Sequence, residues 1–167
     1  MHTVHPTEGL SKADTYRELQ EHLAAILHGE RDGLANSANT AALLYQVLPD
    51  LNWAGFYFLR GGELVLGPFQ GKVACIRIAL GRGVCGSAAQ QKETLVVPDV
   101  HAFPGHIACD AASRSEIVVP LLRNGQVIGV LDLDSPQLAR FDQQDAEGLG
   151  KAVELLLSHS DWERLTD

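Results

Sequence analysis

A two-residue turn late in the chain constrains the fold more than any other feature. Asn124-Gly125 separates two strand-like runs, residues 116–122 and 126–134. Both positions of a two-residue hairpin turn require positive φ angles, which Asn and Gly tolerate, so this pair is a strong hairpin signal. The sequence therefore predicts that these two runs are adjacent antiparallel strands.

The remaining chain divides into helical and strand-like segments. Helical spacing of apolar residues predicts helices from Ser11 to before Gly29, over 33–48, and after Asp142, with a short helix over 84–91. Further strands are predicted over 53–59, 63–67, 75–78 and 95–97. This order predicts an α+β fold, with a central antiparallel sheet of about six strands flanked by helices. With 167 residues, the chain is expected to form a single domain over 1–167, with its core at about 11–157.

Local signals mark several helix ends and contacts. Ser11 and Asp142 are predicted N-caps, because their side chains accept hydrogen bonds from the first free backbone amides. Gly148 and Gly150 weaken the last predicted helix, so their presence there predicts close packing against a neighbouring element.

Charge and composition exclude several classes of function. The formal net charge is −8 with no cluster of Lys and Arg, which argues against binding to nucleic acid or to anionic membranes. No apolar run approaches the roughly 20 residues that span a bilayer, and residues 1–6 lack the basic and apolar regions of a signal peptide. We therefore expect a cytoplasmic protein, in which three cysteines matter through their chemistry rather than as a disulfide framework.

The three cysteines occupy different settings. Cys109 lies in a long polar segment, residues 99–115, beside His106 and Asp110. Segments of that length inside a compact domain are often functional, and a nearby cationic His lowers a thiol pKa, although Asp110 opposes this effect. The alternative is an inert loop cysteine. Cys75 opens a predicted strand, where a lone cysteine is more often a small core residue. Cys85 lies at a predicted helix start, where packing is the more common role and a thiolate stabilised by the helix dipole is the alternative.

Carboxyl groups gather on the last two predicted strands. Asp132 and Asp134 are two residues apart, so their side chains point to the same face of the sheet. Two adjacent carboxylates repel, and one of them tends to keep its proton near neutral pH. Glu116 begins the neighbouring strand and is expected to face the same pocket. The alternatives are a capped strand end for the aspartates and a solvated strand end for Glu116.

Two further groups have competing interpretations. Trp53 and Tyr57 lie on one side of a strand, where aromatic residues either fill the core or form the wall of a thioether pocket. His101, His106 and Cys109 have spacing that is compatible with zinc, but a full structural site needs a fourth ligand and Asp110 is a poor one.

Four short motifs resemble a known family. They are Asn-Trp-Ala-Gly-Phe-Tyr at 52–57, Gly-Val-Cys-Gly at 83–86, Pro-Asp-Val at 98–100 and Ile-Gly-Val-Leu-Asp-Leu-Asp-Ser at 128–135. Together they resemble a GAF domain over about 11–157. With the three cysteines and the acidic pair, the chain resembles the free methionine-(R)-sulfoxide reductases in particular.

The resemblance implies a closed pocket for one free amino acid and reduction of free methionine-(R)-sulfoxide. It implies that Cys109 is the catalytic cysteine, that Cys75 is the main resolving cysteine and that Cys85 is a third cysteine of variable role. Glu116, Asp132 and Asp134 match the family's pocket carboxylates, and Trp53 and Tyr57 match its aromatic wall. The implied enzyme uses neither a metal nor a bound organic cofactor, is recycled by an external thioredoxin-type or other dithiol reductant, and forms a homodimer.

Two other classes of function stay open from the sequence. One is a stand-alone GAF sensor that binds a small molecule, since one fold hosts many functions. The other is a zinc-dependent enzyme that uses His101, His106 and Cys109. Within the reductase interpretation, the sequence leaves open whether Cys75 or Cys85 resolves, which carboxyl is protonated, and whether segment 99–115 closes over the substrate.

Overall fold

The computed structural model describes residue 4 and residues 7–106 and 110–166 of the chain. The helices are α1 (Lys12–Leu27), α2 (Gly33–Val47), α3 (Gly83–Gln91), the single 3₁₀ turn η1 (Val100–Ala102) and α4 (Gln143–His159). The strands are β1 (Trp53–Arg60), β2 (Glu63–Gly71), β3 (Arg77–Ala79), β4 (Leu95–Val97), β5 (Ser115–Arg123) and β6 (Gln126–Ser135).

One antiparallel sheet organises the molecule, in the strand order β3-β2-β1-β6-β5-β4. β5 and β6 form the predicted hairpin, and its turn residues Asn124 and Gly125 have φ angles of 51° and 74°. The predicted α+β fold with six antiparallel strands is therefore confirmed. The central position of β1 and β6 places their polar residues in the middle of the sheet rather than at an edge.

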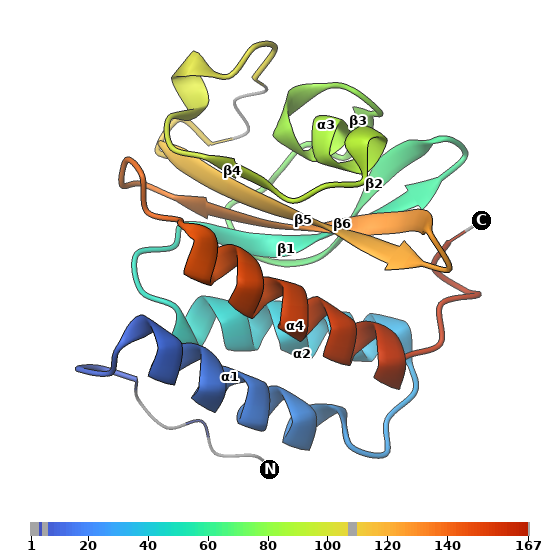
Figure 1. The fold of residues 1–167 in the computed structure, drawn as a ribbon. Coiled ribbons are helices and arrows are strands. Elements are labelled where there is room, and N and C mark those ends of the chain that lie inside the picture. Colours follow the sequence, from blue (N-terminus) through green and yellow to red (C-terminus); the bar gives the residue numbers. More distant parts are fainter. Residues whose placement is uncertain (1–3, 5–6, 107–109, 167) are drawn as a thin grey trace.

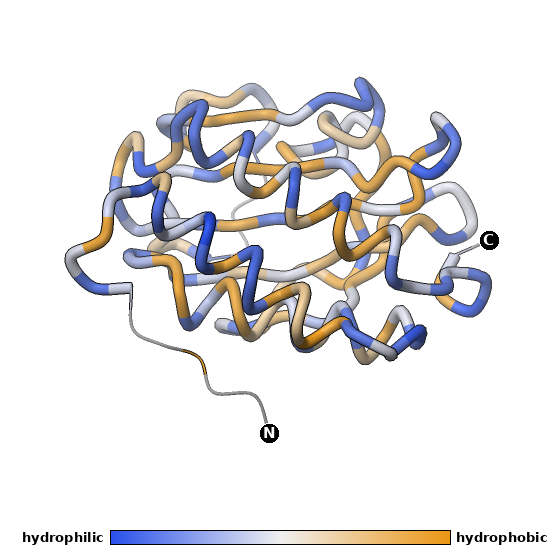
Figure 2. The backbone as a smooth tube through the Cα atoms, turned by 60° about the horizontal axis from the view of Figure 1, so that its bottom comes forward, coloured by the Kyte–Doolittle hydropathy of each residue, from blue (hydrophilic) through white to orange (hydrophobic). Residues whose placement is uncertain are grey.

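The two faces of the sheet are covered differently (Figure 1). Helices α2 and α4 lie against one face, with α1 packed on them on the side away from the sheet, and α3 lies against the other face. In Figure 2, hydrophobic and hydrophilic residues alternate along the helices, as expected for helices with one buried side. No helix in the described part of the chain has the length and apolar character that a membrane crossing requires.

Both predicted helix caps are confirmed. The Ser11 hydroxyl accepts a hydrogen bond from the backbone N–H of Asp14 at 3.1 Å. Asp142 accepts from the backbone N–H of Asp145 at 3.2 Å, and the Asp145 side chain accepts in return from the N–H of Asp142 at 2.9 Å. This reciprocal pair anchors the start of α4 next to the end of β6.

The predicted strand over 75–78 is wrong in its start. β3 begins at Arg77, and Cys75 lies before it in the connection from β2. The β2–β3 ladder runs only from Glu63 to Val65 on the β2 side. Farther along β2, Pro68 has no N–H with which to continue pairing, so the chain that carries Cys75 separates from the sheet edge. β2 itself continues to Gly71 because β1 pairs with it there.

Two glycines of α4 provide a matched test of packing. A Cβ at Gly148 would collide with the ring of Tyr16 on α1, whereas a Cβ at Gly150 would have nothing within 4 Å. Close packing, predicted for both, therefore holds for Gly148 only. We expect Gly148→Ala to lower the free energy of unfolding by about 1–3 kcal/mol through overpacking. Gly150→Ala is expected to raise it by up to about 1 kcal/mol, because alanine is the better helix former.

Urea unfolding followed by circular dichroism measures both effects on the same helix. Equal effects of the two substitutions would contradict the packing of α1 against α4 at Gly148.

Candidate active site

The register of the three central strands brings the acidic residues together. Glu116 on β5 lies directly opposite Asp134 on β6, and Asp134 lies opposite Trp53 on β1. Directly paired residues share a face of the sheet, and so does Asp132, two residues from Asp134. This is the face covered by α3, whereas α2 and α4 lie against the other face. The carboxyl groups therefore lie between the sheet and α3.

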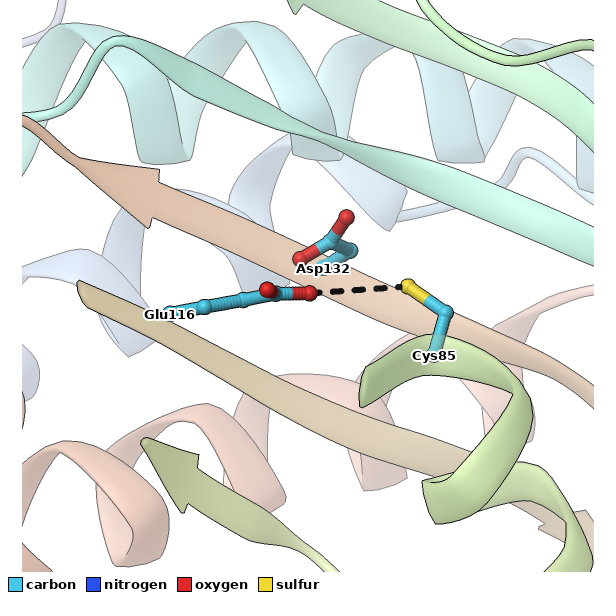
Figure 3. Close-up of side chains that lie close together, drawn as sticks. All are labelled: Cys85, Glu116 and Asp132. Atoms are coloured by element: carbon cyan, nitrogen blue, oxygen red, sulfur yellow. Dashed lines mark hydrogen bonds between the residues drawn. The ribbon is translucent and has the colours of Figure 1, made fainter. Parts of the chain in front are cut away.

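Helix α3 adds a thiol above these carboxyl groups (Figure 3). The Cys85 Sγ lies 3.9 Å from Oε1 of Glu116, and a polar atom from each of Cys85, Glu116 and Asp132 lies within 4.8 Å of the others. The three residues are only 4%, 6% and 6% exposed. Asp132 Oδ1 is buried and has no hydrogen-bond partner among the described residues. A thiol and two carboxyl groups thus share one buried space.

Burial changes the protonation of these groups. It raises the pKa of the Glu116 carboxyl well above its usual range, and the negative charges of Asp132 and Asp134 raise it further. Burial also raises the pKa of Asp132, to about 6. The pKa of Asp134 is raised well above its ordinary value by burial and by Asp132. The pKa of all three carboxyl groups is thus raised by burial, and they favour sharing fewer than three negative charges near neutral pH.

Cys85 is not an activated thiol in this setting. Burial raises its pKa well above the ordinary value, and the charges of Asp132 and Glu116 raise it further. A thiol that keeps its proton is a poor nucleophile. The start of α3 therefore does not make Cys85 a thiolate, although a helix dipole alone favours one.

Aromatic rings form one wall of the pocket. The Trp53 ring stacks on Phe69 and on Tyr57, with ring centroids 5.2 and 5.9 Å apart. Its indole N–H donates to the carbonyl of Lys72 at 3.1 Å, which fixes the orientation of the ring. Gly55 leaves room for it, because a Cβ there would lie 2.6 Å from Trp53 Cη2. The wall is apolar, rigid and adjacent to the carboxyl groups.

The segment predicted to be a functional loop also borders the pocket. His106, Asp110 and Ser113 line it, and η1 is the one regular turn among the described residues of that segment. The Asn52 amide donates to Ser113 Oγ at 2.9 Å and to Asp110 Oδ2 at 3.2 Å, which ties the segment to the start of β1. Three described residues of this segment thus border the pocket.

The positive charge expected on His106, near Cys109, is disfavoured by the surroundings of its ring. Burial and the nearby His101 lower the pKa of His106, so its ring is mostly neutral near neutral pH. The His101 and His106 rings lie 6.3 Å apart, centroid to centroid. Cys109 itself lies outside the described residues. The described His, Cys, Asp and Glu side chains that converge as metal ligands are Cys85, Glu116 and Asp132, and neither histidine is among them.

The other two cysteines, Cys75 and Cys85, differ in bonding and in burial. Cys75 is disulfide-bonded and half-buried, in the connection before β3. Cys85 is a free, buried thiol on α3.

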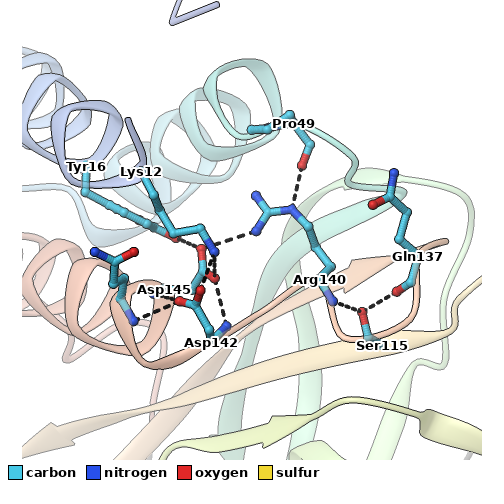
Figure 4. A network of polar contacts seen from close by, with 9 residues as sticks. Lys12, Tyr16, Pro49, Ser115, Gln137, Arg140, Asp142 and Asp145 are labelled. Atoms are coloured by element: carbon cyan, nitrogen blue, oxygen red, sulfur yellow. Dashed lines mark hydrogen bonds and ion pairs between the residues drawn. The ribbon is translucent and has the colours of Figure 1, made fainter. Parts of the chain in front are cut away.

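A polar network holds the start of β5, where Glu116 is located (Figure 4). The Ser115 hydroxyl donates to the carbonyl of Gln137 at 2.6 Å and accepts from the backbone N–H of Arg140 at 3.3 Å. The Arg140 guanidinium lies 3.3 Å from the buried Asp145 carboxylate at the start of α4. The network therefore attaches the strand that carries Glu116 to the helical layer on the opposite face.

Sequence reasoning missed the role of the segment before Cys85. The sequence alone predicts no role for Arg82, but Arg82 and Gly83 line the pocket with Val84. α3 has no side-chain cap at Arg82, so no capping side chain occupies its first backbone amides, the groups that bind anions at helix starts. The sequence signal for this part of the pocket is an arginine at the position before the helix, where a capping side chain such as Ser or Asp is usual.

Known proteins resemble the chain over nearly its whole length. A GAF domain model matches residues 37–156. The chain is 51% identical over 158 residues to free methionine-R-sulfoxide reductase of Escherichia coli (strain K12), covering 93% of this chain and 96% of that protein. It is 53% identical over 147 residues to protein YtsP of Bacillus subtilis (strain 168), covering 87% and 90%. The X-ray structure of free methionine-R-sulfoxide reductase from Neisseria meningitidis in complex with its substrate matches with a TM-score of 0.91, 48% identity and 95% coverage of each chain.

Proposed function

The chain belongs to the GAF-domain family of free methionine-R-sulfoxide reductases, and on that premise we propose that it reduces free methionine-(R)-sulfoxide to methionine. The observation that carries the proposal is the buried pair of Glu116 and Asp132 beside an aromatic wall. A sulfoxide presents a basic oxygen, a methyl group and a sulfur atom within one short unit. A proton donor next to an apolar wall is complementary to that unit.

Each part of the amino acid has a matching group in the pocket. The substrate carboxylate is bound by Arg82 and by the uncapped amides at the start of α3. Its ammonium group pairs with the Asp132 carboxylate, whose Oδ1 lacks a hydrogen-bond partner among the described residues. The methyl group packs against Trp53, and the sulfoxide oxygen faces the carboxyl groups of Glu116 and Asp134.

Glu116 is the proton donor in this proposal. Its pKa is raised by burial and by the charge of Asp132, and in the proposed arrangement a protonated Glu116 lies beside an ionised Asp132 near neutral pH. A protonated carboxyl donates a hydrogen bond to the sulfoxide oxygen and makes the sulfur more electrophilic.

The chemistry proceeds by transfer of one oxygen atom. The Cys109 thiolate attacks the sulfoxide sulfur, the oxygen passes to the Cys109 sulfur, and methionine leaves while Cys109 becomes a sulfenic acid. The Cys75 thiol then condenses with it, which forms a disulfide and releases water. An external dithiol of the thioredoxin type, in a reducing compartment such as the cytoplasm, is oxidised as it restores the two thiols.

Cys75 is the resolving cysteine in this proposal. Its disulfide-bonded state and its location outside the sheet support this role, because a resolving thiol must reach its partner and a reductant. Cys85 is buried, free and held as a thiol, which argues for a supporting role near Glu116.

The proposal is tested with separated epimers of free methionine sulfoxide and dithiothreitol as the reductant. We expect methionine to form from the R epimer alone. If the folded, fully reduced protein converts neither epimer but binds a small molecule, the sensor interpretation replaces the reductase interpretation.

Substrate affinity is expected to depend on pH through Asp132. Its pKa of about 6 means that the charged form, which pairs with the ammonium group, disappears as the pH falls below 6. In a Cys109→Ser variant, which binds without turnover, the Kd for methionine-(R)-sulfoxide should rise about tenfold per pH unit below that point. Isothermal titration between about pH 5 and 7 measures it. The same variant with Asp132→Asn should bind weakly and without this pH dependence, and a flat profile in the parent variant would exclude Asp132 as the ammonium partner.

A further inference from the structure

The group formed by Cys85, Glu116 and Asp132 resembles a metal-binding site in its donor set. It offers one sulfur and two carboxylates, with one polar atom from each residue within 4.8 Å of the others. Thiolate sulfur with oxygen donors is a combination that zinc accepts, usually with four ligands in a tetrahedron. The three side chains come from α3, β5 and β6 and point toward one another (Figure 3).

Asp132 supplies a second observation, independent of this grouping. Its Oδ1 is buried and without a hydrogen-bond partner among the described residues, which is costly for a carboxylate. None of the ion pairs formed by the described residues includes Cys85, Glu116 or Asp132. The group therefore contains a buried carboxylate oxygen that no cationic side chain of the described residues pairs with.

We propose that Cys85, Glu116 and Asp132 bind one thiophilic divalent cation, of which zinc fits the donor set, and that the bound ion blocks the substrate pocket. Zinc bonds of about 2.3 Å to sulfur and about 2.0–2.2 Å to oxygen place sulfur and oxygen ligands about 3.5 Å apart in a tetrahedron. Cys85 Sγ and Glu116 Oε1 are already 3.9 Å apart, so small side-chain movements suffice. The fourth position stays open for water.

Binding of the ion displaces protons from its ligands and involves no oxidation or reduction. The Cys85 thiol and the Glu116 carboxyl each release a proton to the buffer as they bind the ion, and Asp132 binds in its ionised form. The ion occupies the place that the proposed function gives to the substrate ammonium group and to the proton donor. Zinc and methionine sulfoxide therefore exclude one another, and this competition rests on the proposed function, whereas metal binding does not.

Cobalt(II) is the spectroscopic probe for the site. The full-length protein is reduced, freed of reductant without oxygen and titrated with cobalt(II). We expect a near-ultraviolet sulfur-to-cobalt charge-transfer band that saturates at one ion per chain and disappears when zinc is added. Absence of the band from folded, reduced protein would overturn the proposal.

Three variants locate the ligands. Cys85→Ser should remove the band, whereas Cys75→Ser, the matched control for a thiol outside the group, should keep it. Asp132→Asn keeps the thiol and should weaken cobalt affinity at least tenfold, because loss of even an outer-shell partner weakens metal binding by about 10–100-fold. Circular dichroism verifies that each variant is folded. A band that survives in Cys85→Ser and is lost in Cys75→Ser would overturn the proposal, since it would place the ion elsewhere.

The blocking effect is measured separately. In this assay a phosphine replaces the dithiol as the reductant that restores the enzyme thiols. Zinc should then raise the apparent KM for methionine-(R)-sulfoxide, and a chelator should return the KM to its original value. If cobalt binds as expected but the protein reduces no sulfoxide, the proposed function fails and the metal site stands. If zinc binds and leaves the KM unchanged, the blocking part is refuted.

Discussion

Replacing Cys109 with serine is expected to lower kcat for methionine-(R)-sulfoxide by at least about 10³-fold, because a serine hydroxyl is not ionised at neutral pH and cannot accept the oxygen as a sulfenic acid. The protein should still fold and bind the substrate. Methionine formation from the R epimer with dithiothreitol measures the loss. Full turnover by Cys109→Ser would exclude Cys109 as the nucleophile.

Cys75→Ser is the control that separates attack from resolution. This variant retains the nucleophile, so it should release about one methionine per chain in a single turnover and then stall with a thioredoxin-type reductant. A chemical trap for sulfenic acid should label Cys109 in the stalled protein. If Cys85→Ser stalls in this way and Cys75→Ser does not, the assignment of the resolving thiol is reversed.

Asp132→Asn is expected to weaken catalysis and strengthen the fold at the same time. Loss of the charge that pairs with the substrate ammonium and supports the Glu116 proton should lower kcat/KM by about 10²–10³-fold. At pH 7 the variant should be more stable than the parent by about 1–3 kcal/mol, because it removes a charge that is expensive to bury.

The stability gain should depend on pH in a specific direction. Burial raises the folded-state pKa of Asp132 to about 6, above its ordinary value. Asp132 therefore favours the folded state most at low pH, and this stabilisation is lost as the pH rises from about 4 through 6. The advantage of Asp132→Asn, measured by urea unfolding, should shrink toward zero as the pH falls from 7 to about 4. A constant advantage would show that it does not arise from the buried charge.

Asp142→Asn provides the contrasting control. Asp142 caps α4, and its hydrogen bond with Lys12 holds the pKa of that carboxyl below its usual value. Because this contact is on the surface, and because asparagine is also a good cap, the variant should lose less than about 1 kcal/mol at pH 7. The two aspartates thus have opposite expected effects on stability.

Local residue chemistry was enough to determine several turns and helix ends of this fold. Asn124-Gly125 imposes a hairpin through backbone φ angles, and Ser11 and Asp142 begin helices by accepting hydrogen bonds from nearby amides. The two-residue spacing of Asp132 and Asp134 determines that they share a face. Each of these effects operates within a few residues, so the sequence alone is sufficient to predict it.

Only the tertiary structure decided how these elements combine into a site. The pairing of β1 with β6 and of β6 with β5 sets Trp53, Asp134 and Glu116 side by side, although they are far apart in sequence. Cys85 meets Glu116 because α3 packs on that face. The protonation of these groups follows from burial and from charges on other strands, so their pKa values were beyond sequence reasoning. The strand predicted to contain Cys75 was wrong for the same reason: where β3 begins is decided by its pairing with β2, a contact between separate segments rather than a property of the residues around Cys75.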